Sequence, residues 1–122
     1  MTEPQLEHFR RKLLAWREDI LRESMETIHR LQQENLQHPD FIDRAAAAAD
    51  QLVEMQARNR QRKLIAKIDA ALQRIQDGTY GYCEETGEPI SIERLEARPT
   101  ATLSFEARER HERSQKLYRT DD

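Results

Sequence analysis

The apolar residues at the start of the chain recur at steps of three and four, and this spacing constrains the fold more than any other feature. The first series runs through Leu6, Phe9, Leu13, Trp16 and Ile20. Residues spaced in this way share one face of an α-helix and form the seam along which a second helix packs. Beyond residue 20 the apolar set shifts by one position, which predicts a nearly straight helix that leaves the strict heptad. The shifted set is Leu21, Met25, Ile28 and Leu31.

A break in this periodicity separates the first helix from a second. Residues 33–39 lose the apolar spacing, and His38 precedes Pro39, which favours an extended backbone. Asp40 is a favourable N-cap for the second helix, and Gly78 is the residue type that commonly ends one. The seam predicted for this helix consists of Ala45, Ala49, Leu52, Leu64, Ile68, Leu72 and Ile75.

Two long helices joined by a short connection predict a hairpin. Each helix has about 30 residues or more and would measure roughly 45–50 Å at 1.5 Å per residue. A connection of about seven residues makes the helices antiparallel. We therefore expect a mainly α fold in which residues 1–77 form a long antiparallel coiled-coil hairpin with its tip near residues 37–44. We expect residues 103–118 to form a C-terminal helix that packs against the base of this hairpin.

The second part of the chain, residues 78–122, carries the frame of a small zinc finger without its ligands. A structural zinc site has four soft ligands, typically as two Cys-x₂-Cys pairs separated by a loop. Here the first pair is Cys83 and Thr86, and the second pair is Ser104 and Ala107. Neutral hydroxyls are poor zinc ligands and alanine has no donor atom. We therefore predict a small globular, zinc-finger-like base that is metal-free.

Composition and charge exclude several classes of protein. The chain has 122 residues, a net charge of −3, 37% hydrophobic and 35% charged residues, and one cysteine. This charge creates no overall field that favours nucleic acid, and one cysteine excludes an intramolecular disulfide. No apolar run is long enough to span a bilayer, and no signal peptide is recognisable. We expect a soluble, cytoplasmic protein without membrane contact.

No arrangement of residues predicts catalysis or a metal centre. Ser104 and His111 do not make a convincing nucleophile and base, because nothing supplies an oxyanion hole or an orienting acid. The histidines lack ligand spacing with Cys83, and we interpret them as lone surface side chains. These histidines are His8, His29, His38 and His111. We therefore predict that the protein is not an enzyme.

Two carboxylates lie three residues apart near the predicted tip, at Asp40 and Asp43. Helix capping explains both, because each would lie at the positive end of the helix dipole. It does not explain the apolar pair Phe41 and Ile42 at the far end of an arm, where no core exists. A narrow acidic tip on a long hairpin is also suited to entering a channel or cleft. Both explanations remain open at this point.

Several longer motifs carry a resemblance to a known family. They are QLEHFRR at residues 5–11, DxxDRAA at 40–46, RNR at 58–60, RKLI at 62–65, GYCE at 81–84 and RLEARPTA at 94–101. Together they resemble the DksA/TraR family of bacterial transcription factors over nearly the whole chain. Two departures stand out. The N-terminal extension common in the family is absent, and the four-cysteine zinc site is reduced to Cys83.

This resemblance implies a function at RNA polymerase. Such proteins share the architecture of the Gre factors, bind RNA polymerase and insert the arm through its secondary channel. They alter promoter complexes together with guanosine tetraphosphate (ppGpp), the stringent-response effector, without base-specific DNA contacts, and we expect a monomer. The matching positions are Asp40, Asp43 and Ala45 at the acting tip, Leu64, Lys67, Arg98 and Arg108 facing ppGpp, and Arg60 as a contact to the polymerase.

Two alternatives stay open beside this hypothesis. A thiol-based redox or metal sensor on the same scaffold would use Cys83, and an unrelated helical adaptor is a weaker possibility. The stretch from Arg58 to Arg74 contains six basic residues and one acidic residue, which suits pyrophosphate. For any single one of them, a solvated helix face is the ordinary explanation. That Lys67, Arg98 and Arg108 converge is implied by the resemblance alone.

Overall fold

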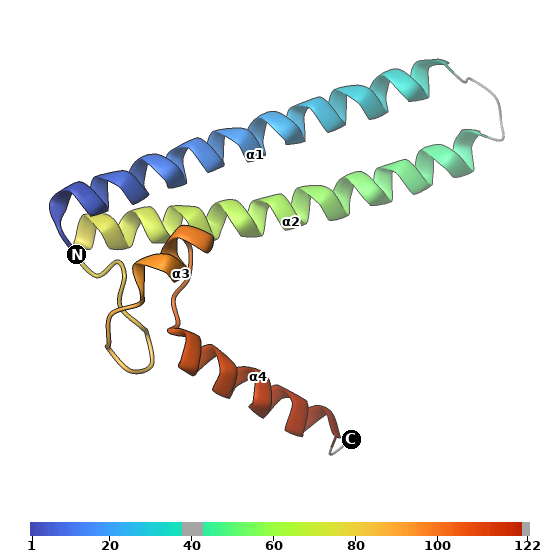
Figure 1. Ribbon diagram of the computed structural model, residues 1–122. Coiled ribbons are helices and arrows are strands. Elements are labelled where there is room, and N and C mark those ends of the chain that lie inside the picture. Colours follow the sequence, from blue (N-terminus) through green and yellow to red (C-terminus); the bar gives the residue numbers. More distant parts are fainter. Residues whose placement is uncertain (38–42, 121–122) are drawn as a thin grey trace. The chain divides into compact units, whose positions relative to one another are not determined.

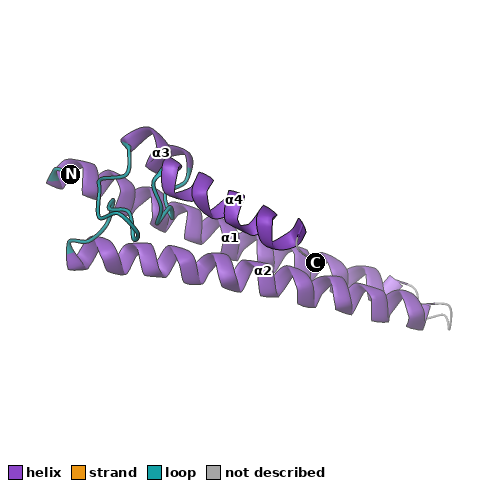
Figure 2. Ribbon diagram, turned by 90° about the horizontal axis from the view of Figure 1, so that it is seen from below, coloured by secondary structure: helices purple, strands orange, loops and turns teal. Residues whose placement is uncertain are grey.

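The fold consists of helices and turns in the parts of the chain that the structure, a computed structural model, describes, namely residues 1–37 and 43–120. Within these residues no strand forms, as Figure 2 shows. An isolated antiparallel bridge pairs Tyr82 with Pro89. No described helix is long and apolar enough to cross a membrane. The helices are α1 (Glu3–Gln37), α2 (Asp43–Asp77), α3 (Ile92–Ala97) and α4 (Phe105–Thr120) (Figure 1).

The chain divides into two compact units, which we call the base and the arm. The base comprises Met1–Leu13 and Ala70–Asp122, and the arm comprises Leu14–Asp69. Both α1 and α2 therefore contribute to each unit. This grouping differs from the expected division at residue 77, because the first turns of α1 and the last turns of α2 pack with the zinc-finger-like segment.

The boundaries of the two long helices follow local signals. Helix α1 continues to Gln37, through part of the segment where the apolar spacing is lost, because glutamine, glutamate and leucine favour helix without tertiary contacts. Helix α2 ends at Asp77, and Gly78 follows with a φ of +81°, which confirms the predicted glycine stop. The N-cap predicted at Asp40 lies outside the described residues.

The arm is a pair of antiparallel helical segments with a narrow seam (Figure 1). Ile20 and Ile68 are buried in it, and Arg17 Nε donates to Asp69 Oδ1 at 2.8 Å. The predicted one-position shift of the seam is wrong at Leu21, which is 42% exposed, and at Met25, which is 73% exposed. It is confirmed at Ile28 and Leu31, which are half-buried. Among residues 21–33 of α1, the other half-buried positions are Ser24 and Thr27, so small polar side chains share the seam with apolar ones.

The second helix of the arm also departs from its predicted seam. Leu52 is 56% exposed, whereas Asp50 and Glu54 are half-buried. Nearer the base, Leu64 is half-buried and Ile68 is fully buried, as predicted. Apolar burial in the arm is therefore concentrated in the turns of α2 that precede the base.

The core of the base draws on all four helices. Its buried apolar residues are Phe9, Leu13, Ala71, Tyr80, Cys83, Ile90, Leu95, Ala101 and Ala107. The rings of Phe9 and Tyr80 lie 5.8 Å apart between centroids, at an angle of 49°. Burial raises the pKa of Tyr80 to about 12, so its hydroxyl stays protonated and donates to the Pro99 carbonyl at 2.8 Å. This bond anchors the turn that follows α3.

The C-terminal helix forms where it was predicted but packs differently. Helix α4 buries Ala107 in its first turns, whereas its residues 109–117 are exposed. The expectation that this helix packs against the base of the hairpin is therefore wrong for residues 109–117. Ion pairs to Glu85 tie α4 to the turn after Cys83, through His111 and through Arg110 Nη2 at 4.0 Å. The charged sequence of α4 leaves it without an apolar stripe for a longer contact.

Candidate functional site

The predicted acting tip is described in part. Asp43 is the first residue of α2 and Ala45 lies in its first turn, while Asp40 lies outside the described residues. The side chains of Asp43 and Ala45 are likewise not described. The role of this tip therefore stays a prediction from the resemblance.

The four positions of the zinc-finger frame come together in the base. The first pair lies in a tight turn, in which Gly87 N donates to the Cys83 carbonyl at 2.9 Å and Cys83 N donates to the Glu88 carbonyl at 2.8 Å. The second pair opens α4, because Ser104 Oγ accepts from Ala107 N at 3.3 Å. The chain thus keeps the two backbone turns that present zinc ligands in a finger.

Cys83 is buried in the base, where 3% of the residue is exposed. Burial raises the pKa of this thiol, but side-chain and backbone hydrogen bonds from Thr86 and Ser104 outweigh burial. Together they lower its pKa from 9.0 to about 6. The same bonds show that Thr86 and Ser104 converge on Cys83, as the frame predicted.

This set of side chains does not fit zinc. Cys83 would supply one thiolate, and Thr86 and Ser104 would supply neutral hydroxyls, which bind zinc weakly. The fourth position is the methyl group of Ala107, which is fully buried. Across the described part of the chain, no group of three or more histidine, cysteine, aspartate or glutamate residues is placed to hold a metal ion. Hydrogen bonds and packing hold the two turns together instead.

Glu96 joins α3 to the first turns of α1 within the base. Lys12 Nζ donates to Glu96 Oε2 at 2.7 Å and to the Glu96 carbonyl at 2.8 Å, and His8 Nε2 lies 2.6 Å from Glu96 Oε1. The hydrogen bond from Lys12, followed by that from His8, lowers the pKa of Glu96. His8 is therefore a surface histidine, as predicted, but it has a carboxylate partner and is not a lone side chain. The same holds for His111, which contacts Glu85.

The lowered pKa of Glu96 predicts a pH-dependent stabilisation of the base. A carboxylate whose pKa falls on folding stabilises the fold fully above its unfolded value, here 4.5, and this stabilisation is lost as pH falls through the folded pKa. We expect Glu96→Gln to lower the free energy of unfolding at neutral pH, and the difference from wild type to shrink below pH 4.5. Denaturant unfolding at several pH values measures it.

Glu84→Gln is the matched control for this experiment. Glu84 is exposed, and its side chain makes no ion pair with any residue that the structure describes. A deficit in Glu96→Gln that stays constant from neutral to acid pH would contradict the assigned contacts.

The predicted ppGpp-facing residues are divided between the two units. Leu64 and Lys67 lie on α2 in the arm, where Leu64 is half-buried and Lys67 exposed. Arg98 and Arg108 lie in the base, at the end of α3 and in the first turns of α4. Arg60, the predicted polymerase contact, is exposed on α2. The convergence of these residues remains a prediction.

The two arginines of the base that are predicted to face ppGpp differ in their surroundings. The Arg98 side chain is exposed and makes no ion pair with the residues described, whereas Arg108 Nε donates to Glu112 Oε1 at 3.1 Å. The sequence analysis missed Glu112. Its spacing of four residues from Arg108 predicts an ion pair, because residues four apart are neighbours on a helix. The contacts of Glu85 with α4 had no such signal, since they join residues 25 or more positions apart.

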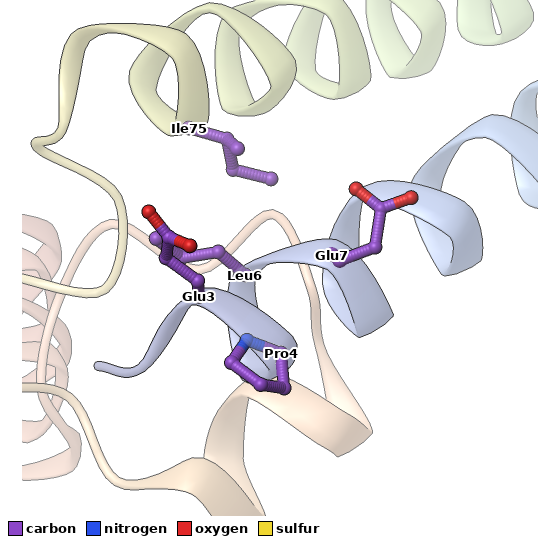
Figure 3. Close-up of a pocket in the computed structure, with 5 residues that line it drawn as sticks. All are labelled: Glu3, Pro4, Leu6, Glu7 and Ile75. Atoms are coloured by element: carbon purple, nitrogen blue, oxygen red, sulfur yellow. The ribbon is translucent and has the colours of Figure 1, made fainter.

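A shallow hollow of about 490 Å³ lies in the base, and the sequence did not indicate it. Figure 3 shows Ile75 of α2 facing Leu6 of α1 across the hollow, with Pro4 also at its wall and the carboxylates of Glu3 and Glu7 beside it. Arg10 and Arg11 hydrogen-bond to Glu7 and lower its pKa to about 2. The hollow brings together no set of polar groups that would orient a ligand.

Comparison with known families identifies the chain. The model of the N-terminal domain of DnaK suppressor protein DksA matches residues 5–75, and the model of the prokaryotic dksA/traR C4-type zinc finger matches residues 78–113. The chain belongs to the DksA/TraR family. Within the segment that matches the C4-type zinc finger, Cys83 is the sole cysteine, so this DksA/TraR member lacks the other three zinc cysteines.

Individual DksA proteins show the same relationship over most of the chain. The RNA polymerase-binding transcription factor DksA of Caulobacter vibrioides is 60% identical over 121 residues, which are 99% of this chain and 85% of that protein. The protein of the same name from Escherichia coli K12 is 45% identical over 108 residues, covering 88% of this chain and 72% of the relative.

A solved structure supports the fold. The transcription factor DksA2 from Pseudomonas aeruginosa has a TM-score of 0.85 and 38% identity, covering 95% of this chain and 89% of that one. The family and the hairpin fold with a C-terminal helix are therefore confirmed. The names of these relatives also agree with a regulator rather than an enzyme.

Proposed function

We propose that this chain is a cytoplasmic RNA polymerase-binding regulator of transcription initiation that needs no zinc. The match to DksA proteins along almost its whole length, at 60% identity, is the observation that carries the proposal. The arm would enter the secondary channel of the polymerase, with the base at the rim. The protein would act as a monomer and without sequence-specific DNA contacts.

The proposal assigns separate tasks to separate parts of the molecule. Residues 1–77 would serve as the hairpin that reaches the active centre, with Asp40, Asp43 and Ala45 acting there, and residues 78–122 as the module that remains outside. The exposed position of Arg60 on α2 leaves its guanidinium accessible for a contact to the polymerase. Four residues carried over from the resemblance would form the predicted ppGpp wall of this protein, and the polymerase would form the other wall. They are Leu64, Lys67, Arg98 and Arg108.

Lifetimes of promoter complexes test this function directly. Purified polymerase is allowed to open a ribosomal RNA promoter, and decay of the complex is followed with the protein alone, with ppGpp alone and with both. We expect the protein to shorten the lifetime and ppGpp to enhance that effect. Lifetimes that do not change at any protein concentration would contradict the proposal.

Zinc independence gives a second expected result. Structural zinc supplies folding free energy through a complete ligand set, which one cysteine and two hydroxyls do not form. We therefore expect the purified protein to contain well below one zinc per chain and to unfold at the same denaturant concentration with and without chelator. Elemental analysis and chelator-dependent unfolding measure both quantities. One zinc per chain, lost together with the fold on chelation, would overturn the prediction.

The lowered pKa of Cys83 favours a second candidate function, a thiol-based sensor. A thiolate reacts with oxidants, and a thiol pKa of about 6 makes the thiolate prevalent at neutral pH. Burial of the sulfur opposes this candidate, because oxidants reach an accessible thiolate more readily. Cys83→Ser retains a small polar group, so we expect it to regulate promoters as wild type does. If peroxide inactivated the wild type and spared the folded variant, the sensor function would be favoured instead.

A further inference from the structure

Among the cations of the predicted ppGpp wall, Arg108 alone has a carboxylate partner within the part of the chain that the structure describes. Its Nε donates to Glu112 Oε1 at 3.1 Å, one helical turn further along α4. Lys67 and Arg98 are exposed, and neither makes an ion pair with a described residue. Of the two predicted ppGpp-facing arginines, Arg98 is thus available to a phosphate, whereas Arg108 already has a carboxylate partner.

The ion pair of Arg108 and Glu112 is exposed to solvent, and a ligand can displace the carboxylate from the guanidinium. The side chains of Arg108 and Glu112 are 42% and 58% exposed, so water screens their attraction. Exposed pairs at this helical spacing contribute little to stability. A phosphate oxygen can replace the carboxylate at the arginine, because guanidinium binds both groups through the same fork of donors. Glu112 would then remain near the ligand as an unpaired negative charge.

We propose that Glu112 is an internal competitor for the polyphosphate that Arg108 binds. The carboxylate occupies Arg108 in the free protein and must be displaced when ppGpp is bound, which raises the ppGpp concentration needed for the response. The inference rests on the proposed function, because it requires that ppGpp contacts Arg108. It extends that function by naming a residue that weakens ppGpp binding and does not itself bind ppGpp.

Glu112→Gln tests the competition. Labelled protein is titrated with RNA polymerase at several ppGpp concentrations, and the ppGpp concentration giving half of the enhancement is compared between variants. We expect Glu112→Gln to lower this midpoint by about two- to fivefold, from loss of an exposed ion pair and of one like charge near the phosphates. Glu109→Gln is the matched control, because Glu109 lies on the same helix and pairs with Arg113 at 3.9 Å instead.

Repeating the test in the Arg108→Ala variant separates competition for Arg108 from a general effect of Glu112→Gln on α4. In Arg108→Ala, the additional change Glu112→Gln should not lower the midpoint beyond a small gain from the lost charge, since no guanidinium remains to be released. A purely structural role of Glu112 would shift the midpoint equally in both backgrounds, and would overturn the proposal.

The possible failures are distinguishable. If ppGpp tightens binding of the wild type but Glu112→Gln has the same or a higher midpoint, the competition is wrong and the proposed function stands. If ppGpp leaves polymerase binding of the wild type unchanged, the ppGpp part of the proposed function is wrong, and the competition with it.

Discussion

Replacing Asp40 and Asp43 together by asparagine is expected to abolish the effect on promoter complexes while the protein remains bound to RNA polymerase. The expectation follows from the proposed function, in which binding is spread along the arm and base and the tip carboxylates act inside the channel. Asparagine caps helices about as well as aspartate, so the hairpin should lose little stability. Promoter-complex lifetimes and a polymerase titration of the same variant measure the two quantities.

Two other carboxylates of the hairpin provide the matched control. Glu23 and Glu26 are exposed on α1, and neither makes an ion pair with a described residue. Changing both to glutamine removes the same charge from the arm and should leave regulation intact. Normal regulation by the tip variant would mean that Asp40 and Asp43 are only helix caps.

Arg98→Ala is expected to remove most of the enhancement by ppGpp, and so is Lys67→Ala. Each charge-assisted contact to phosphate contributes about 1.5–3 kcal/mol, so loss of one should weaken ppGpp binding by roughly one to two orders of magnitude. By linkage, ppGpp and polymerase must strengthen each other's binding to the protein by the same factor. Titration of polymerase with labelled protein, with and without ppGpp, measures this factor for each variant.

Arg62→Ala controls for a general loss of positive charge. Arg62 is exposed on α2, and no residue described pairs with it. We expect its ppGpp enhancement to match that of the wild type. Equal losses in Arg62→Ala and Arg98→Ala would mean that overall charge, and not a defined site, attracts the ligand.

Features encoded by neighbouring residues could be predicted from the sequence. The glycine stop at Gly78 and the two hairpin helices follow from residue preferences over one or two turns. Beyond Ile20 the apolar pattern predicts Ile28 and Leu31 correctly, but it cannot indicate Ser24 and Thr27, which are polar and half-buried on the same helix. Two helices share one narrow contact strip, in which side chains are only half-buried. Small polar side chains can therefore occupy it without a large desolvation cost.

Contacts between distant residues could not be predicted in this way. The ion pair between Lys12 and Glu96 joins residues 84 positions apart, and nothing in either local sequence indicates the partner. The zinc-finger frame was the exception, because the spacing of two turns survives when its ligands do not. The spacing therefore placed Cys83 and Ser104 together correctly, and the hydroxyls at the lost ligand positions predicted hydrogen bonds there, but not the lowered thiol pKa.

Competition with a Gre factor tests the central claim, occupancy of the polymerase secondary channel, most directly. Labelled protein is bound to purified RNA polymerase, and an unlabelled Gre factor, which the family resemblance expects to use the same channel, is added in increasing amounts. The account predicts direct binding and complete displacement by the competitor, with the Asp40 and Asp43 double variant displaced in the same way. Absence of binding, or binding that persists under saturating Gre factor, would contradict it.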